Sequence, residues 1–144
     1  MNIKGRTQTN PYLTFNGNCE EAMKFYKEAT GGELYMMPFE GSPVRVPKGY
    51  ESKVLHSTLT FGDAVIMASD TVPGRESEAG TNCHVMLGCD ALEDAEVLFH
   101  NLSHNGTVTI PFSVSYSGAR FGMFTDKYGI HWMVHCDCEA SGCG

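Results

Sequence analysis

Apolar positions along the chain recur with two different periods, which predict two helices and a larger set of strands. In 19–30, Ala22, Phe25, Tyr26 and Ala29 follow the three- and four-residue spacing of a helix that buries one face. The segment 92–102 has the same spacing. Short apolar or alternating runs, typical of strands, occupy 53–61, 64–69, 119–125 and 130–135. The pattern therefore predicts an α+β protein.

Capping signals support both helices. Asn18 and Asp90 are each followed three residues later by a glutamate, the pattern of an N-terminal capping box. Gly31 and Asn105, each followed by another glycine, stand where the two helices should end. The sequence thus predicts where each helix begins and ends.

The two helices belong to an internal repeat. Residues 12–39 and 85–112 align at an offset of 73, and each reads as a strand, a helix and a strand that ends in Pro-Phe. Two more strands follow each copy, so each half is βαβββ. The modules span about 10–70 and 81–136, and about 65 residues bury little core alone, so one domain over 1–136 is expected. A ferredoxin-like βαββαβ dimer is the alternative, but the extra strand in each half counts against it.

The composition of the chain narrows the classes of molecule that it is expected to bind. The chain has 144 residues and a formal net charge of −7, which argues against nucleic acid and anionic membranes. No apolar run is long enough to span a bilayer, and residues 1–13 lack the apolar core of a signal peptide. A cytoplasmic protein is expected.

The cysteines raise two questions. Without a secretory signal they are expected to be reduced thiols. Cys19 stands at the start of the first helix, where the helix N-terminus lowers a thiol pKa, although a buried, inert thiol is the favoured interpretation. Near the C-terminus, His135 and three cysteines offer loose ligands for a soft metal, but their spacing fits no standard zinc site and 137–144 is predicted to be a disordered tail. The six cysteines are at positions 19, 83, 89, 136, 138 and 143.

Three segments carry a family resemblance: PYLTFNGNCEEAMKFYKEATGGEL (11–34), HSTLTFGDAVIMASD (56–70) and GARFGMFTDKYGIHWMV (118–134). In this order they resemble the PhnB-like branch of the vicinal oxygen chelate superfamily, which includes glyoxalase I, extradiol dioxygenases and bleomycin-resistance proteins. The resemblance implies a curved mixed sheet around a ligand cup, with the helices on the other face, and a homodimer. One departure is Ser117, with Tyr116 beside it, where PhnB-like chains usually carry tryptophan.

Alternation along the strands then assigns side chains to the cup. In 53–61 the cup-facing set is Val54, His56, Thr58 and Thr60, and in 81–88 it is Asn82, His84 and Met86. Offsets of 65 and 73 between the halves place Phe121 opposite His56 and Pro11 opposite His84.

Metal-dependent members of the superfamily bind their ion with His or Glu on the first and last strand of each half. The matching positions here are Pro11, Met67, His84 and Met133, or Trp132 if the last strand slips by one residue. One imidazole does not make a site for a hard cation, so neither a metal nor another cofactor is predicted. The alternative is a rearranged site in which His84 and His56 are joined by His131 or His135.

The leading hypothesis is a metal-free protein that binds a small molecule. The alternatives are a metal-dependent lyase, isomerase or dioxygenase, and a structural protein whose cup is filled by side chains. PhnB-like chains often carry the name of a ubiquinone-pathway methyltransferase, but no G-x-G-x-x-G turn is present. His56 is the candidate general acid or base, because imidazole titrates near neutral pH. The candidate ligand-binding residues are His56, Thr58, Met67, His84, Met86, Tyr116, Phe121 and Met133.

Overall fold

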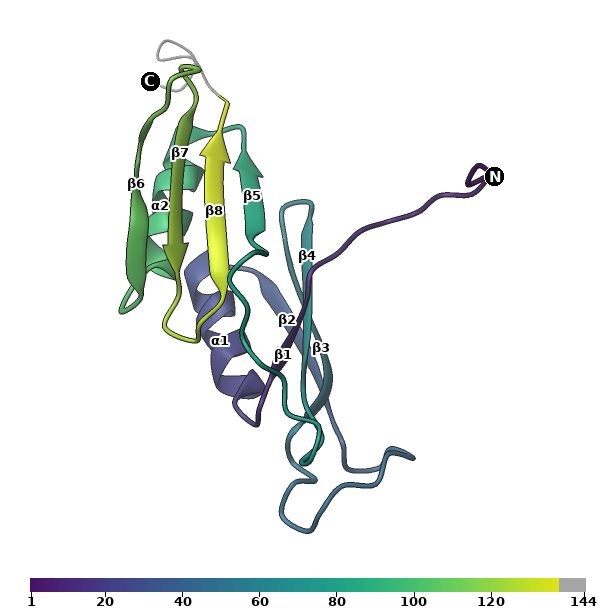
Figure 1. Cartoon of the computed structure of the whole chain (residues 1–144). Helices are drawn as coiled ribbons and strands as arrows, with labels where there is room; N and C mark the ends of the chain where they lie inside the picture. The colour runs from purple at the N-terminus through teal and green to yellow at the C-terminus, as the bar shows by residue number, and fades with distance from the viewer. Residues whose placement is uncertain (138–144) are drawn as a thin grey trace. The chain divides into compact units, whose positions relative to one another are not determined.

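The computed structural model describes residues 1–137, and Figure 1 shows its two helices and eight strands. No helix among these residues is long and apolar enough to cross a membrane. The first half contains β1 (Tyr12–Phe15), α1 (Cys19–Thr30), β2 (Glu33–Pro38), β3 (Val54–Phe61) and β4 (Ala64–Asp70). The second half contains β5 (Val85–Cys89), α2 (Leu92–Leu102), β6 (Thr107–Val114), β7 (Arg120–Thr125) and β8 (His131–Cys136).

The chain forms two compact units with the same topology. The first comprises Met1–Lys27 and Gly31–Ser77, and the second comprises Glu28–Thr30 and the chain from Glu78 onward. Each unit has one four-stranded sheet, with strand orders β1-β4-β3-β2 and β5-β8-β7-β6. In each sheet one pair is parallel and the others are antiparallel, so both sheets are mixed.

This arrangement confirms the predicted α+β fold class of two tandem βαβββ modules. That the modules pack as one domain over 1–136 stays a prediction. Of the predicted disordered tail, residues 138–144 lie outside the described residues.

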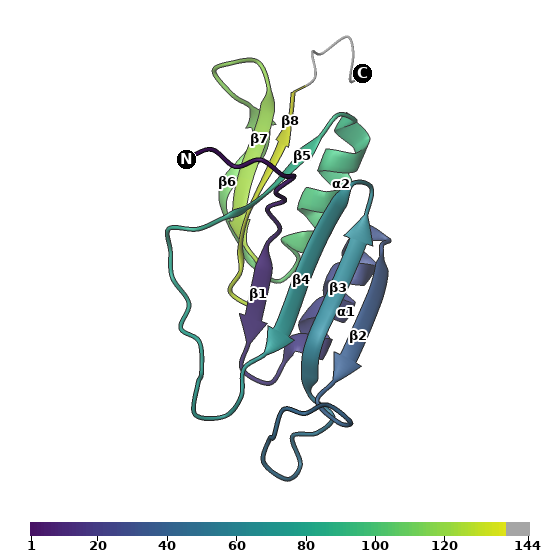
Figure 2. The ribbon, with the colours of Figure 1, turned by 90° about the vertical axis from the view of Figure 1, so that its right-hand side faces the viewer.

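In the first unit, α1 covers one face of the sheet, as Figure 2 shows. The Cys19 thiol lies 3.7 Å from the hydroxyl of Ser57 on β3, and both residues are fully buried. Gly31 ends the helix in the left-handed conformation, with φ of 72°, and its N–H donates to the carbonyl of Lys27. The predicted end of this helix is therefore confirmed.

The N-terminus of α1 is held by Asp70 rather than by the predicted capping residue. The Asn18 side chain makes no capping hydrogen bond. Instead, the N–H groups of Gly17 and Cys19 each donate to Asp70 Oδ1 over 2.9 Å, and the Val54 N–H donates to Asp70 Oδ2 over 2.9 Å. A carboxylate with an exposure of 4% thus ties the β1–α1 turn to the start of β3.

In the second unit, α2 packs on its sheet through Phe99. Its ring lies 5.1 Å from that of Phe124 and 5.6 Å from that of Phe112, measured between centroids. On β7, a Cβ atom at Gly122 would lie 2.5 Å from Phe99 Cε2, so only glycine allows this approach. The helix begins at Leu92 with Ala91 as its cap, so the prediction that Asp90 caps it is wrong by one residue.

The single tryptophan belongs to this core and does not line a ligand surface. Trp132 has no exposed area, and its indole N–H donates to Asp126 Oδ2 over 2.8 Å. The other oxygen of Asp126 accepts the N–H groups of Tyr128 and Ile130, which closes the turn between β7 and β8. Burial of this carboxylate is therefore matched by hydrogen bonds on both oxygens.

Candidate functional site

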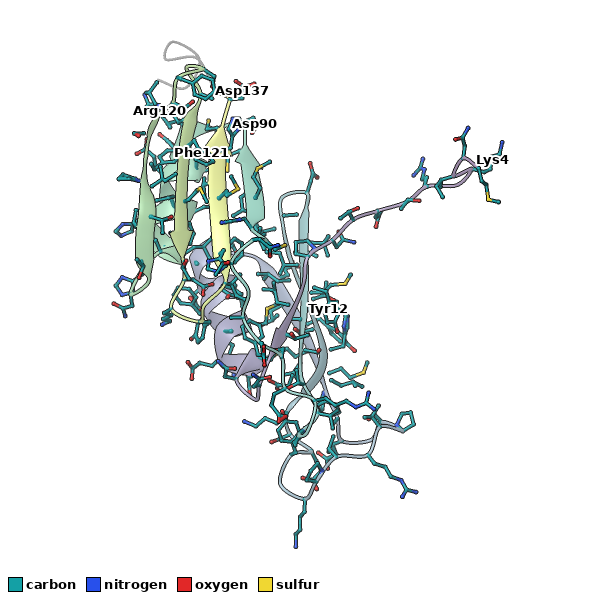
Figure 3. The ribbon with its side chains drawn as sticks, viewed as in Figure 1. Lys4, Tyr12, Asp90, Arg120, Phe121 and Asp137 are labelled. Atoms are coloured by element: carbon teal, nitrogen blue, oxygen red, sulfur yellow. The ribbon has the colours of Figure 1, made fainter. Side chains whose placement is uncertain are left out.

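Each sheet has an open face, defined here as the face opposite the one on which its helix packs. On β4, Ile66 and Ala68 are buried toward α1, so Met67 between them points to the open face. The register pairs Met67 with Tyr12 on one side and with Thr58 on the other. The open face of the first unit therefore carries Tyr12, Met67 and Thr58 in one row, and Figure 3 labels Tyr12 on β1.

A chain of hydrogen bonds crosses this face. The hydroxyl of Tyr12 lies 3.0 Å from His56 Nδ1, and His56 Nε2 lies 3.1 Å from the hydroxyl of Thr58. The rings of Tyr12 and His56 also stack, with centroids 5.7 Å apart. Both partners of the imidazole are hydroxyls, which can donate or accept, so the chain accommodates either neutral tautomer of His56. The two hydroxyls together hold the His56 ring in one orientation.

Tyr12 is the functional residue that sequence reasoning missed. His56 requires an orienting partner, and the strand pattern alone does not say which residue supplies it. Part of the signal for Tyr12 is the alternation of side chains along β1, which pairs in parallel with β4. Phe15 is buried and lies three residues after Tyr12, so Tyr12 points to the opposite, open face. What the sequence lacks is the register that brings the Tyr12 hydroxyl to the His56 ring.

One side-chain assignment on β3 is wrong. Alternation predicts that Val54 shares a face with His56 and Thr58, but Val54 is buried, with an exposure of 3%. The pairing of β2 with β3 shifts by one residue between Met37 and Pro38, so Met37 faces His56 whereas Pro38 faces Val54. This bulge breaks the period-two alternation at the start of β3.

The open face of the second unit carries most of the remaining predicted residues. On β8, Trp132 and Val134 are buried, and Met133 between them points to the open face. Met133 pairs with Met86 on β5 and with Met123 on β7, which gives a row of three methionines. Phe121, labelled on β7 in Figure 3, pairs with His135 on the same face. These residues are half-buried, except Met86, which is 58% exposed.

Two histidines lie beside this row, each two residues before one of its methionines, Met86 or Met133. The rings of His84 and His131 lie 5.5 Å apart between centroids. His131 Nε2 must carry a hydrogen, because its partner at 2.8 Å is the Gly80 carbonyl, which only accepts. Its Nδ1 lies 2.8 Å from the hydroxyl of Thr125. His131 thus has both nitrogens engaged, whereas His84 has no hydrogen-bond partner within residues 1–137.

The register also corrects the alignment of the two halves. Because Tyr12 pairs with Met67 and Met86 pairs with Met133, Tyr12 is the structural equivalent of Met86, at an offset of 74 rather than 73. Pro11 is therefore not the counterpart of His84. The connection from strand to helix is one residue shorter in the second half, which restores the offset of 73 in the helices.

The residues at the superfamily's metal positions do not fit a hard divalent cation. Pro11 has no donor side chain, and its carbonyl accepts the Met67 N–H over 3.0 Å. Met67 and Met133 offer neutral thioethers, so His84 alone is a suitable ligand. Within residues 1–137, no group of three or more His, Cys, Asp or Glu side chains is placed to hold a metal. His56 lies in the first unit and His84 in the second, and the rearranged site that joins them stays a prediction.

Tyr116 and Cys19 are the two remaining residues for which the sequence suggested a role. Tyr116 lies in the turn between β6 and β7 and is fully exposed. Burial raises the pKa of the Cys19 thiol to about 12 and outweighs the hydrogen bond between Cys19 and Ser57, which lowers this pKa. The favoured prediction of an inert thiol at this position is therefore supported, because the thiolate is the reactive form.

Comparison with known proteins identifies relatives along nearly the whole chain. The family model described as 3-demethylubiquinone-9 3-methyltransferase matches residues 7–135. Protein PA1353 from Pseudomonas aeruginosa is 41% identical, with a TM-score of 0.81 over 91% of this chain and 98% of that one. The PhnB protein from Bacillus cereus is 24% identical, with a TM-score of 0.72 over 90% and 99% of the two chains.

The fold extends to more distant proteins. A glyoxylase/bleomycin resistance protein/dioxygenase domain from Frankia is 13% identical, with a TM-score of 0.62 over 95% of this chain and 96% of that domain. At this identity the likeness concerns the fold alone.

Proposed function

This chain belongs to the family described as 3-demethylubiquinone-9 3-methyltransferase, in the PhnB-like branch of the vicinal oxygen chelate superfamily, and we propose that it binds a small molecule without a divalent metal ion. The observation that carries the proposal is the hydrogen-bonded chain of Tyr12, His56 and Thr58 on the open face of the first unit. It is a polar group, partly exposed, beside Met67 and Met37.

The chemistry of this group indicates the class of ligand. If His56 Nδ1 carries the hydrogen and donates to Tyr12, the phenolic hydroxyl is left to donate to a ligand oxygen. If Tyr12 donates to His56 instead, its oxygen accepts from a ligand hydroxyl or amine. The neighbouring thioethers and rings favour an apolar or aromatic body. We therefore expect an aromatic ligand with one hydroxyl or carbonyl group.

The same geometry gives His56 a chemical role if the bound molecule reacts. An imidazole held between two hydroxyls exchanges a proton at Nδ1 with Tyr12 while Thr58 stabilises Nε2. His56 is thus the candidate general acid or base, and it would act on the ligand through Tyr12.

We do not propose methyl transfer, although the family's description names it. Doubly wound methyltransferases hold their cofactor at a glycine-rich turn between a parallel strand and a helix. The sheets of residues 1–137 are four-stranded and mostly antiparallel, and in the β1–α1 turn the N–H groups of Gly17 and Cys19 already donate to Asp70. A metal-dependent lyase, isomerase or dioxygenase finds no support in the donor set described above.

Assembly and compartment are part of the proposal. Strand β6 lies at the edge of its sheet and exposes Val108, Ile110 and Val114, which suits pairing with a second copy in a homodimer. Cys19, Cys83 and Cys89 are free thiols, which suits the reducing cytoplasm. Cys136 is disulfide-bonded, so the prediction that the cysteines are all reduced thiols is wrong at this position.

The test uses three fluorinated probes and protein treated with EDTA. 4-Fluorophenol, 4-fluorobenzoate and 4-fluorotoluene share an aromatic body and differ in their polar group, and binding is followed by ¹⁹F NMR. We expect 4-fluorophenol to bind more tightly than 4-fluorotoluene and to lose this advantage in Tyr12→Phe. Tyr116→Phe is the control, because Tyr116 is a fully exposed tyrosine in the turn between β6 and β7 of the other unit.

Two results would overturn the proposal. One is binding that appears only when Zn²⁺, Ni²⁺, Mn²⁺ or Fe²⁺ is added, which would establish the metal-dependent alternative. The other is equal behaviour of Tyr12→Phe and Tyr116→Phe, which would show that the polar chain does not contact the ligand.

A further inference from the structure

The methionine row on the second unit has a donor set that the proposed function does not use. Met86, Met133 and Met123 occupy matching positions on β5, β8 and β7, three adjacent strands. Met123 and Met133 each stand between two buried residues, and Met86 pairs with Met133, so all three share the open face. Paired residues on neighbouring strands have Cβ atoms about 5 Å apart, and methionine has three rotatable bonds, so the three sulfurs can reach a common point.

An imidazole with no hydrogen-bond partner among residues 1–137 completes the donor set. His84 precedes Met86 by two residues, and its ring lies beside that of His131, which precedes Met133 by two residues. The two ring nitrogens of His131 form hydrogen bonds with the Gly80 carbonyl and the Thr125 hydroxyl, and these bonds fix the orientation of the ring. His84 has no hydrogen-bond partner in the described part of the chain and is half-buried, so one of its nitrogens is available to bind a cation.

The charge and softness of these donors select the cation. Three thioethers and one imidazole are neutral ligands, and no carboxylate stands in the row or in the pair of histidines beside it. Hard divalent cations prefer charged oxygen ligands, whereas thioethers are typical ligands of Cu(I). The chain's net charge of −7 also favours the approach of a cation. We propose that Met86, Met123, Met133 and His84 form a binding site for monovalent copper.

The first unit provides an internal comparison. Met67 is the structural equivalent of Met133, but its neighbours in the row are Tyr12 and Thr58 instead of two methionines. A single thioether between hydroxyls is a poor soft-metal site, so Met67 should not bind the ion. The two proposals lie on different units and are measured with different probes, so each can fail without the other.

The experiment observes the methionine methyl groups directly, because the cysteines also bind soft metals. Full-length protein labelled at the ¹³C methyl of methionine is treated with N-ethylmaleimide to block accessible thiols. Silver(I), a diamagnetic substitute for Cu(I), is then titrated in chloride-free buffer. We expect the signals of Met86, Met123 and Met133 to shift together and to saturate at one ion per chain, while the Met67 signal stays in place.

Substitutions then test the ligands. Met133→Leu and Met86→Leu conserve side-chain volume, and Met86 is exposed on an edge strand, so at least that variant should fold normally. Loss of one ligand should weaken silver binding about tenfold or more, and Met67→Leu should leave it unchanged. A titration that leaves the three signals in place, or that shifts all eight methionines according to their exposure, would overturn the proposal. So would equal affinities of Met86→Leu and Met67→Leu.

Discussion

Replacing Asp70 by asparagine tests how the polar chain on the first unit is positioned. The carboxylate joins the turn after β1, which carries Tyr12, to the start of β3, which carries His56. The asparagine side chain of Asp70→Asn would keep one acceptor oxygen and lose the other. Its amide N–H₂ would then face either the Val54 N–H or the N–H groups of Gly17 and Cys19, and two donors cannot pair.

The expected cost follows from these three bonds. A hydrogen bond to a charged acceptor contributes about 1.5–3 kcal/mol and a neutral one about 1 kcal/mol, so each bond that survives loses about 1 kcal/mol. A buried N–H left without an acceptor costs about 1–3 kcal/mol. We therefore expect Asp70→Asn to lower the free energy of unfolding by about 3–5 kcal/mol, the range typical of a broken buried charge interaction.

Urea unfolding followed by circular dichroism measures this change. Asp63→Asn, at an exposed turn between β3 and β4, is the control for loss of one negative charge and should change stability by less than about 0.5 kcal/mol. Hydrogen exchange should also show faster opening of the first turn of α1 in Asp70→Asn. A loss below about 1 kcal/mol, or an equal loss in Asp63→Asn, would refute the reasoning.

Two further predictions concern the core. Cys19 should react far more slowly with a thiol reagent at pH 8 than exposed Cys83, because burial raises its pKa from 9.0 to about 12. The folded state holds the Cys19 proton more tightly than the unfolded state does. The stability that this group contributes is therefore complete below pH 9 and is lost as the pH rises toward 12. Thermal unfolding of Cys19→Ser should lack this part of the decline in stability, and an identical decline in both proteins would contradict the assignment. Gly122→Ala should lose about 1–3 kcal/mol through its clash with Phe99. Gly88→Ala, whose added Cβ would make only an ordinary contact of 3.9 Å with Met86 Sδ, should be tolerated in the same chemical denaturation, and equal losses would rule out the clash.

Much of the fold follows from the sequence because its signals are local. The helical spacing of 19–30, the glycine stop at Gly31 and the alternation in 130–135 each depend on a few neighbouring residues, and the structure has helix and strand there. The repeat adds a second copy of every signal, so an ambiguous strand in one half is supported by its counterpart. This redundancy explains why the strand order of both sheets fits the predicted modules.

The failures all involve pairing across a distance in sequence. Asn18 has the composition of a cap, but Asp70, on a strand 51 residues beyond Cys19, reaches the helix N-terminus instead. Val54 breaks alternation because of a bulge that only the register with β2 reveals. Tyr12 was missed for the same reason, since its contact with His56 depends on β1 pairing with β4. Single-chain patterns carry no register, so these features require the structure.

The ring nitrogens of His56 provide the most direct test of the central claim, that a ligand binds the open face of the first unit without a divalent metal. The measurement is a long-range ¹H–¹⁵N spectrum of the histidines in EDTA-treated protein, recorded with and without saturating 4-fluorophenol. We predict that the His56 nitrogens shift, whereas those of His131, held by Gly80 and Thr125, do not. An unchanged His56 signal, or a shift that requires an added divalent ion, would contradict the account.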